Sequence, residues 1–114
     1  MSCKLRISSE AEACLKEQIQ WYKSDEKHGG AELASRWLAL IEVAMIEICK
    51  VPKKHGFAPE NGRWNPDLNI RQMRFKPWKT KSVWRVLYVL DETSGIVTIL
   101  QVRHERRKLL FEKE

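Results

Sequence analysis

The basic side chains of the C-terminal half are the residues whose type and spacing point most clearly to chemistry. Between Arg71 and Lys108 the chain carries ten Lys and Arg residues against three Asp and Glu residues, a net charge of +7 in a chain whose total is +6. Such a segment concentrates anions, whether RNA, DNA or an acidic protein segment. The alternative is a solvated, lysine-rich surface. The candidate binding residues are Arg71, Arg74, Lys76, Lys79, Lys81, Arg103 and Arg107.

Metal, cofactor and membrane sites are not indicated by the remaining residues. The sequence has no CxxC pair and no His/Cys cluster at ligand spacing, so we expect no metal and no cofactor. Cys3, Cys14 and Cys49 are odd in number and widely spaced, and we expect them to be small buried side chains in a reducing compartment. No segment resembles a membrane span or a signal peptide, so we expect a cytoplasmic protein without a membrane partner.

Two helices are predicted in the N-terminal half, after a short strand over residues 4–8. A capping box, Ser9-Glu10-Ala11-Glu12, opens the first helix, and His28-Gly29-Gly30 ends it. The second helix carries an apolar stripe over residues 34–48 and is closed by Pro52. This stripe is broad enough to be covered on two sides, by the sheet and by either the first helix or a partner chain.

Three strands are predicted in the C-terminal half. Residues 53–67 read as a loop rich in Gly, Pro and Asn, and its long part, 56–67, is either functional or partly disordered. Strands follow over residues 68–75, 83–90 and 96–103, with a bulge expected between Ile70 and Met73 and a five-residue hairpin loop at 91–95. Residues 104–114 form a charged tail.

The order β-α-α-β-β-β predicts an α+β fold. A single layer of mostly antiparallel sheet would carry the helical hairpin on one face. A chain of 114 residues buries one core and is too short for two, so we expect residues 1–114 to form one domain.

Two segments of the predicted strands resemble a known family. The motifs are Trp84-Arg85-Val86-Leu87-Tyr88-Val89 and Ile99-Leu100-Gln101-Val102-Arg103-His104-Glu105-Arg106-Arg107, preceded by Lys50-Val51-Pro52 and Ile70-Arg71-Gln72-Met73. In this order they resemble the RelE/ParE toxin superfamily, the toxin components of type II toxin–antitoxin systems and plasmid stabilisation proteins. The resemblance covers nearly the whole chain except the 56–67 loop and the final tail.

The resemblance implies a cytoplasmic toxin that is held silent by a co-encoded antitoxin. In one branch of the family the toxin cleaves messenger RNA on the ribosome, and Arg85 and His104 match the residues used at the scissile phosphate and for proton transfer. A guanidinium suits the charge of the pentavalent phosphorane, and a histidine can take and give protons near neutral pH. Such an enzyme would be a metal-independent endoribonuclease, and Trp78 could stack a splayed base.

Several observations keep other interpretations open. Phe111 stands near the position where several nuclease members carry a tyrosine. Pairing Leu90 with Ile96 would place Arg85 opposite Gln101 and His104 on the other face of the sheet. Arg85 could instead be an ion-pair partner of Glu42 or Glu47, and His104 a hydrogen-bonded residue at the sheet edge.

Three functions therefore follow from the sequence. The first is a messenger-RNA-cleaving toxin that uses Arg85 and His104. The second is a ParE-type inhibitor of DNA gyrase without catalysis, in which the helical hairpin carries the function. The third is a non-toxic RelE-like binding protein.

Overall fold

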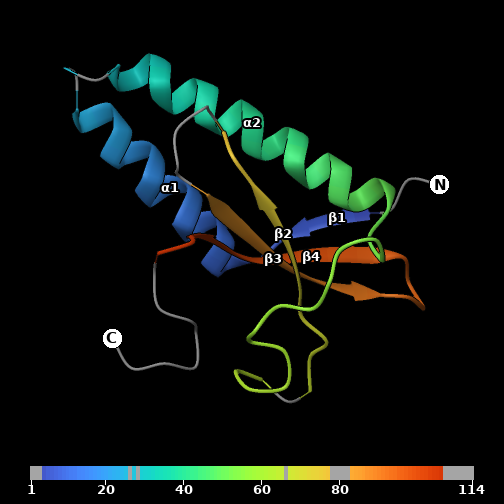
Figure 1. Cartoon of the computed structure of the whole chain (residues 1–114). Coiled ribbons are helices and arrows are strands. Elements are labelled where there is room, and N and C mark those ends of the chain that lie inside the picture. The colour runs from blue at the N-terminus through green and yellow to red at the C-terminus, as the bar shows by residue number, and fades with distance from the viewer. Residues whose placement is uncertain (1–3, 26, 28, 66, 78–82, 107–114) are drawn as a thin grey trace.

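The predicted order of elements is confirmed. The computed structural model describes residues 4–25, 27, 29–65, 67–77 and 83–106. Its elements are β1 (Lys4–Ile7), α1 (Ser9–Ser24), α2 (Gly30–Lys50), β2 (Arg71–Phe75), β3 (Trp84–Asp91) and β4 (Ile96–His104) (Figure 1). The fold is α+β, as expected.

The four strands form one mixed sheet in the order β1-β4-β3-β2. β2, β3 and β4 pair antiparallel, while β1 lies parallel to β4 at the edge. The helical hairpin α1–α2 covers one face of this sheet (Figure 1). The expected mostly antiparallel layer with a hairpin on one face is therefore correct.

The ends of the two helices differ in detail from the prediction. The N-cap of α1 is Ser8, whose Oγ accepts a hydrogen bond from the backbone N–H of Ala11 at 3.1 Å. Ser9, the predicted cap, is already the first helical residue. Gly29 adopts a φ of 117° as the N-cap of α2, so its freedom at positive φ serves the start of the second helix and not the end of the first.

The main core lies between the hairpin and the sheet. Its largest fully buried members are Trp37, Ile41 and Ile48 of α2 and Tyr88 and Ile99 of the sheet. Tyr88 also donates a hydrogen bond from its hydroxyl to the Pro52 carbonyl at 2.5 Å, and burial raises its pKa to about 12. This contact ties the chain that leaves α2 to the central strand.

The opposite face of the sheet is covered by residues 56–70, which we call the strap. Ala58 and Ile70 are buried against Leu87 in a second, smaller core. The Ala58 N–H donates to the Ile70 carbonyl at 2.8 Å, and the Ile70 N–H donates to Asn61 Oδ1 at 2.8 Å. The long loop expected from the sequence is thus a packed element that closes the second face.

The irregularity of the sheet lies elsewhere than expected. β2 begins only at Arg71, so the slip in alternation near Ile70 marks the end of the strap and not a bulge. The register shift occurs between β3 and β4, where Leu87 pairs with Gln101 while Tyr88 pairs with Ile99. Leu100 is the extra residue of this bulge.

The cysteines do not all behave as expected. Cys14 is free and half-buried, and its Sγ lies 3.3 Å from Gln101 Oε1. Cys49 is disulfide-bonded, so its assignment as a reduced side chain was wrong. Within the described part of the chain, no helix has both the length and the apolarity to cross a membrane.

Candidate anion-binding site

Three arginines lie side by side across three neighbouring strands. Arg74 of β2 is directly opposite Arg85 of β3, and Arg85 is directly opposite Arg103 of β4. We call these three residues the arginine row. Because directly opposite residues share a face, and Arg85 shares its face with Leu87, the row faces the side that the strap covers. Like charges in direct cross-strand positions repel each other, so the row requires compensating groups.

Arg85 is compensated by a buried carboxylate from the strap. Its Nη2 forms an ion pair with Glu60, and its Nε donates to Gln72 Oε1 at 2.8 Å. Arg85 is 4% exposed and Glu60 is fully buried. The third nitrogen, Nη1, is buried and has no hydrogen-bond partner in the described part of the chain. The middle of the row thus contains a buried guanidinium donor without a partner among the described residues.

The partner of Arg85 was not identified from the sequence. The expected partners, Glu42 and Glu47, are exposed on α2, and Glu47 pairs with Lys50 at 3.3 Å. The sequence feature that could have indicated the segment carrying Glu60 is the apolar character of both faces of β3. A strand buried on both faces needs a second cover, and the long loop before β2, which carries Glu60, can supply one.

The outer arginines of the row differ in exposure. Arg74 is exposed and forms an ion pair with Glu105 at the end of β4. Arg103 is buried, and its Nη1 donates to Gln101 Oε1 at 3.5 Å. The row is therefore exposed at β2 and buried at β3 and β4.

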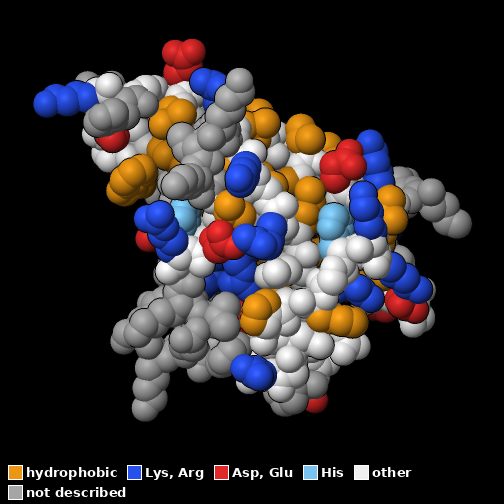
Figure 2. Space-filling view, in the orientation of Figure 1, with side chains coloured by type: hydrophobic (Ala, Val, Ile, Leu, Met, Phe, Trp, Pro, Cys, Tyr) orange, Lys and Arg blue, Asp and Glu red, His pale blue; other side chains and the backbone are white. Residues whose placement is uncertain are grey.

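The remaining predicted basic residues are distributed around the row. Arg71 holds the strap, because its Nη1 donates to the His55 carbonyl at 2.6 Å and its guanidinium carbon lies 4.2 Å from the centre of the Phe57 ring. Lys76 is exposed just beyond the end of β2. The described residues do not include the other predicted basic residues, Lys79, Lys81 and Arg107. They also do not include Trp78, the predicted base-stacking residue. In the view of Figure 2, Lys and Arg side chains gather over the middle of the molecule, below the helices.

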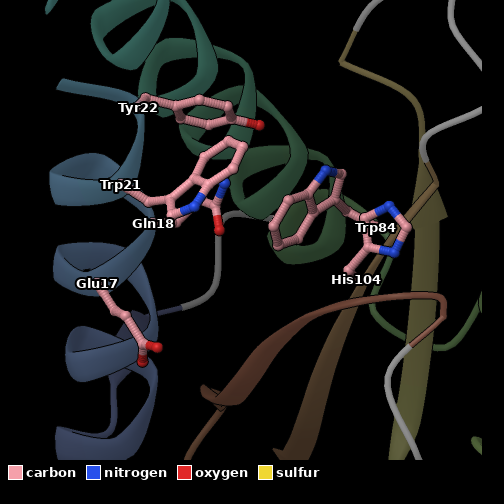
Figure 3. Close-up of a pocket in the computed structure, with 6 residues that line it drawn as sticks. All are labelled: Glu17, Gln18, Trp21, Tyr22, Trp84 and His104. Carbon is pink, nitrogen blue, oxygen red and sulfur yellow. The ribbon is translucent and has the colours of Figure 1, made fainter. Parts of the chain in front are cut away.

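His104 lies on the other face of the sheet. It is directly opposite Trp84, and the two rings meet edge to face with centres 5.3 Å apart. Its Nδ1 accepts a hydrogen bond from the Arg106 N–H at 3.1 Å. His104 lines a hollow on the α1 side of the sheet (Figure 3). The expected placement on opposite faces is confirmed, although Arg85 is opposite Arg103 and not Gln101.

The outer surface of α2 carries an apolar stripe that nothing in the described chain covers. Leu40, Val43 and Ile46 are 36%, 55% and 53% exposed. Their spacing of three residues places them along one side of the helix. The sequence predicted that this helix is covered by the sheet and by either the first helix or a partner chain, and the structure shows the sheet and α1. In the described chain, neither of these covers reaches the stripe.

Comparison with known proteins establishes the fold. No protein-family model matches the sequence, and no curated protein matches it. Among solved structures, the E. coli toxin RelE, a double arginine mutant in the free state, superposes with a TM-score of 0.53 at 12% identity, covering 93% of this chain and 86% of that chain.

Two toxin–antitoxin complexes are also similar. They are RelBE2 from Mycobacterium tuberculosis, at 16% identity and a TM-score of 0.48, and an archaeal RelE–RelB complex from Pyrococcus horikoshii, at 13% and 0.45. They cover 92% and 95% of this chain, respectively, and 100% of their own chains. Of these three similarities, only the one to the E. coli protein has a TM-score above 0.5. This similarity shows that the fold of this chain is RelE-like.

Proposed function

We propose that this chain is the toxin of a type II toxin–antitoxin pair and that its arginine row binds the phosphates of RNA. The observation that carries the proposal is the row itself, with the unpartnered Nη1 of Arg85 at its centre. The RelE-like fold supports the proposal, because it is the fold expected from the family resemblance.

Phosphate is the anion that fits the row best. A guanidinium offers donors in a fixed fork, which matches the oxygens of a phosphate. The exposed Arg74 and Lys76 stand at the open end of the row, where they would attract the RNA backbone. Glu60 and Gln72 hold Arg85 in place, so that its free donor points in a defined direction.

Cleavage of the RNA would follow the chemistry of its own 2′-hydroxyl. That oxygen attacks the neighbouring phosphorus and the 5′-oxygen of the next nucleotide leaves, with one proton removed and one supplied. Arg85 would stabilise the charge that develops on the pentavalent phosphorus. His104, the residue proposed for proton transfer, lies on the opposite face and reaches the same phosphate only where the RNA passes over the strand ends.

The antitoxin would occupy two surfaces. An amphipathic segment would cover Leu40, Val43 and Ile46 of α2, and an acidic segment would lie along the arginine row and exclude RNA. Both partners would meet the toxin in the cytoplasm. This arrangement explains in one step why α2 is apolar on its outer side and why the basic residues are concentrated on the sheet.

Expression in a bacterial host tests the toxin proposal. Induction of this chain alone should arrest growth, and co-expression with the product of the adjacent reading frame should restore it. Equal growth in both cases would contradict the proposal and favour the non-toxic binding protein. Growth arrest with intact messenger RNA and blocked gyrase supercoiling would favour the ParE-type alternative.

A further inference from the structure

A cavity on the face opposite the arginine row has the form of a binding site for a planar ring. It has a volume of about 340 Å³ and lies between α1 and the adjoining ends of β3 and β4. Its lining residues are Glu17, Gln18, Trp21, Tyr22, Trp84 and His104 (Figure 3). A smaller cavity of about 70 Å³ shares Glu17, Gln18, Trp84 and His104 with it. Cavities that hold small ligands begin at about 300 Å³, so the space suits one ring system and not an extended chain.

The walls of this cavity are aromatic. Trp21 is 61% exposed, although a large apolar side chain in water is unfavourable. Its ring meets that of Tyr22 edge to face at 5.4 Å, and Trp84 on the opposite wall is packed against Trp37 at 5.2 Å. A rigid wall and an exposed indole facing the same space form a platform on which a base can stack.

The polar groups of the cavity select among bases. Glu17 offers only acceptors, and its carboxylate lies on the cavity side of α1 (Figure 3). The base-pairing edge of guanine presents two adjacent N–H donors, which match a carboxylate in a bidentate manner. The same edge of adenine presents an acceptor beside one donor group, and a carboxylate repels that acceptor.

His104 and Gln18 complete the ring of polar groups. Because His104 Nδ1 accepts from the Arg106 N–H, the nitrogen left for a ligand is Nε2. Gln18 hydrogen bonds with Tyr22 and carries both a donor and an acceptor. These groups can satisfy the purine atoms that Glu17 does not reach.

The cavity and the arginine row lie at the same end of the sheet. Trp84 and His104 are paired in register, and the next pair along the same two strands is Arg85 and Arg103 on the other face. The exposed Lys76 and Arg106 follow the ends of β2 and β4 at this same end of the sheet. A single strand of RNA that crosses this end could place a phosphate on the row and a nearby base in the cavity.

We propose that the cavity binds an unpaired guanine base and so sets the sequence preference of the toxin; this rests on the proposed function in that the guanine belongs to the RNA substrate. Stacking would come from Trp21 and Trp84, and discrimination from Glu17.

Binding of the free nucleoside tests the cavity without the arginine row, because guanosine carries no phosphate. Saturation-transfer NMR on the purified full-length chain should show binding of guanosine and weaker binding of adenosine. Trp21→Ala should weaken guanosine binding about 5- to 150-fold, which corresponds to the loss of one stacked base at about 1–3 kcal/mol. Glu17→Gln should retain stacking and lose the preference for guanosine.

Trp64→Ala is the matched control, because Trp64 is an exposed tryptophan of the strap and does not line the cavity. It should bind guanosine as the wild type does. No guanosine binding, or an unchanged preference in Glu17→Gln, would overturn the proposal. Guanosine binding without any RNA cleavage would support the guanine-binding cavity and contradict the proposed nuclease function. RNA cleavage with no preference for guanine would support the nuclease function and contradict the guanine-binding cavity.

Discussion

The carboxylate of Glu60 and the guanidinium of Arg85 form an ion pair in which one side chain is 0% and the other 5% exposed. The pair joins the strap to the central strand of the sheet. A buried ion pair contributes little net stability compared with an apolar pair, but loss of one partner leaves the other charge unpaired in the interior. The two residues are therefore expected to depend strongly on each other.

Glu60→Gln should reduce the free energy of unfolding by about 3–5 kcal/mol, because it removes the counter-charge of a buried guanidinium. Arg85→Gln should have a similar effect. Combining the two should cost much less than the sum, since neither charge is then left alone. Urea denaturation of the four proteins measures this, and additive losses would contradict the coupling.

Tyr88→Phe should lower stability at neutral pH by about 0.5–1.5 kcal/mol, because the hydrogen bond to the Pro52 carbonyl is lost. Burial raises the Tyr88 pKa from 10.0 to about 12, so the folded state retains the phenolic proton longer than the unfolded state. The stability that this provides is complete below pH 10 and is lost as the pH rises towards 12. Unfolding of wild type and variant across this range should show a steeper decline in the wild type, and parallel curves would be inconsistent with a buried phenol.

Val43→Asp should weaken binding of the antitoxin by at least tenfold, because it places a charge in the centre of the apolar stripe of α2. Val43 is 55% exposed, so the fold should remain intact by circular dichroism. Ala31→Asp is the control, because Ala31 is exposed on the same helix near its start. Equal affinities of the two variants, measured by isothermal titration calorimetry, would place the antitoxin elsewhere.

RNA binding should weaken steeply as salt increases. For single strands, the slope of log affinity against log salt is about 0.7 per neutralised phosphate. The double variant Arg74→Gln/Lys76→Gln should reduce the slope by about 1.4 if each residue neutralises one phosphate. Lys23→Gln/Lys27→Gln removes the same charge at the end of α1 and should leave the slope unchanged. Two equal slopes would mean that the row is not the RNA-binding surface.

The faces of the strands could be predicted from the sequence, because side chains alternate strictly and hydrophobic side chains mark the buried sides. That rule placed Arg85 and His104 on opposite faces, and the structure agrees. The register could not be predicted, because Leu100 is apolar like its neighbours and nothing in its type marks it as the extra residue of a bulge.

The strap is the element whose packing was hardest to predict from the sequence. Residues 56–67 contain Gly, Pro and Asn at intervals that carry no helical or strand period, so pattern alone cannot reveal that Ala58 and Glu60 are buried. The arginine row depends on this segment, since Glu60 holds its central member. The basic residues of the site were thus predictable from charge, whereas the acidic residue that organises them was not.

Mapping of cleavage in a translating extract tests the central claim most directly. Arg85→Lys retains a positive charge for Glu60 but loses the guanidinium fork. If Arg85 stabilises the transition state at the phosphate, cleavage detected by primer extension should fall about 10²–10³-fold while the protein remains folded. A gyrase supercoiling assay run in parallel should show no inhibition by the wild type. Cleavage by Arg85→Lys at the wild-type rate, or intact messenger RNA together with blocked supercoiling, would contradict the account.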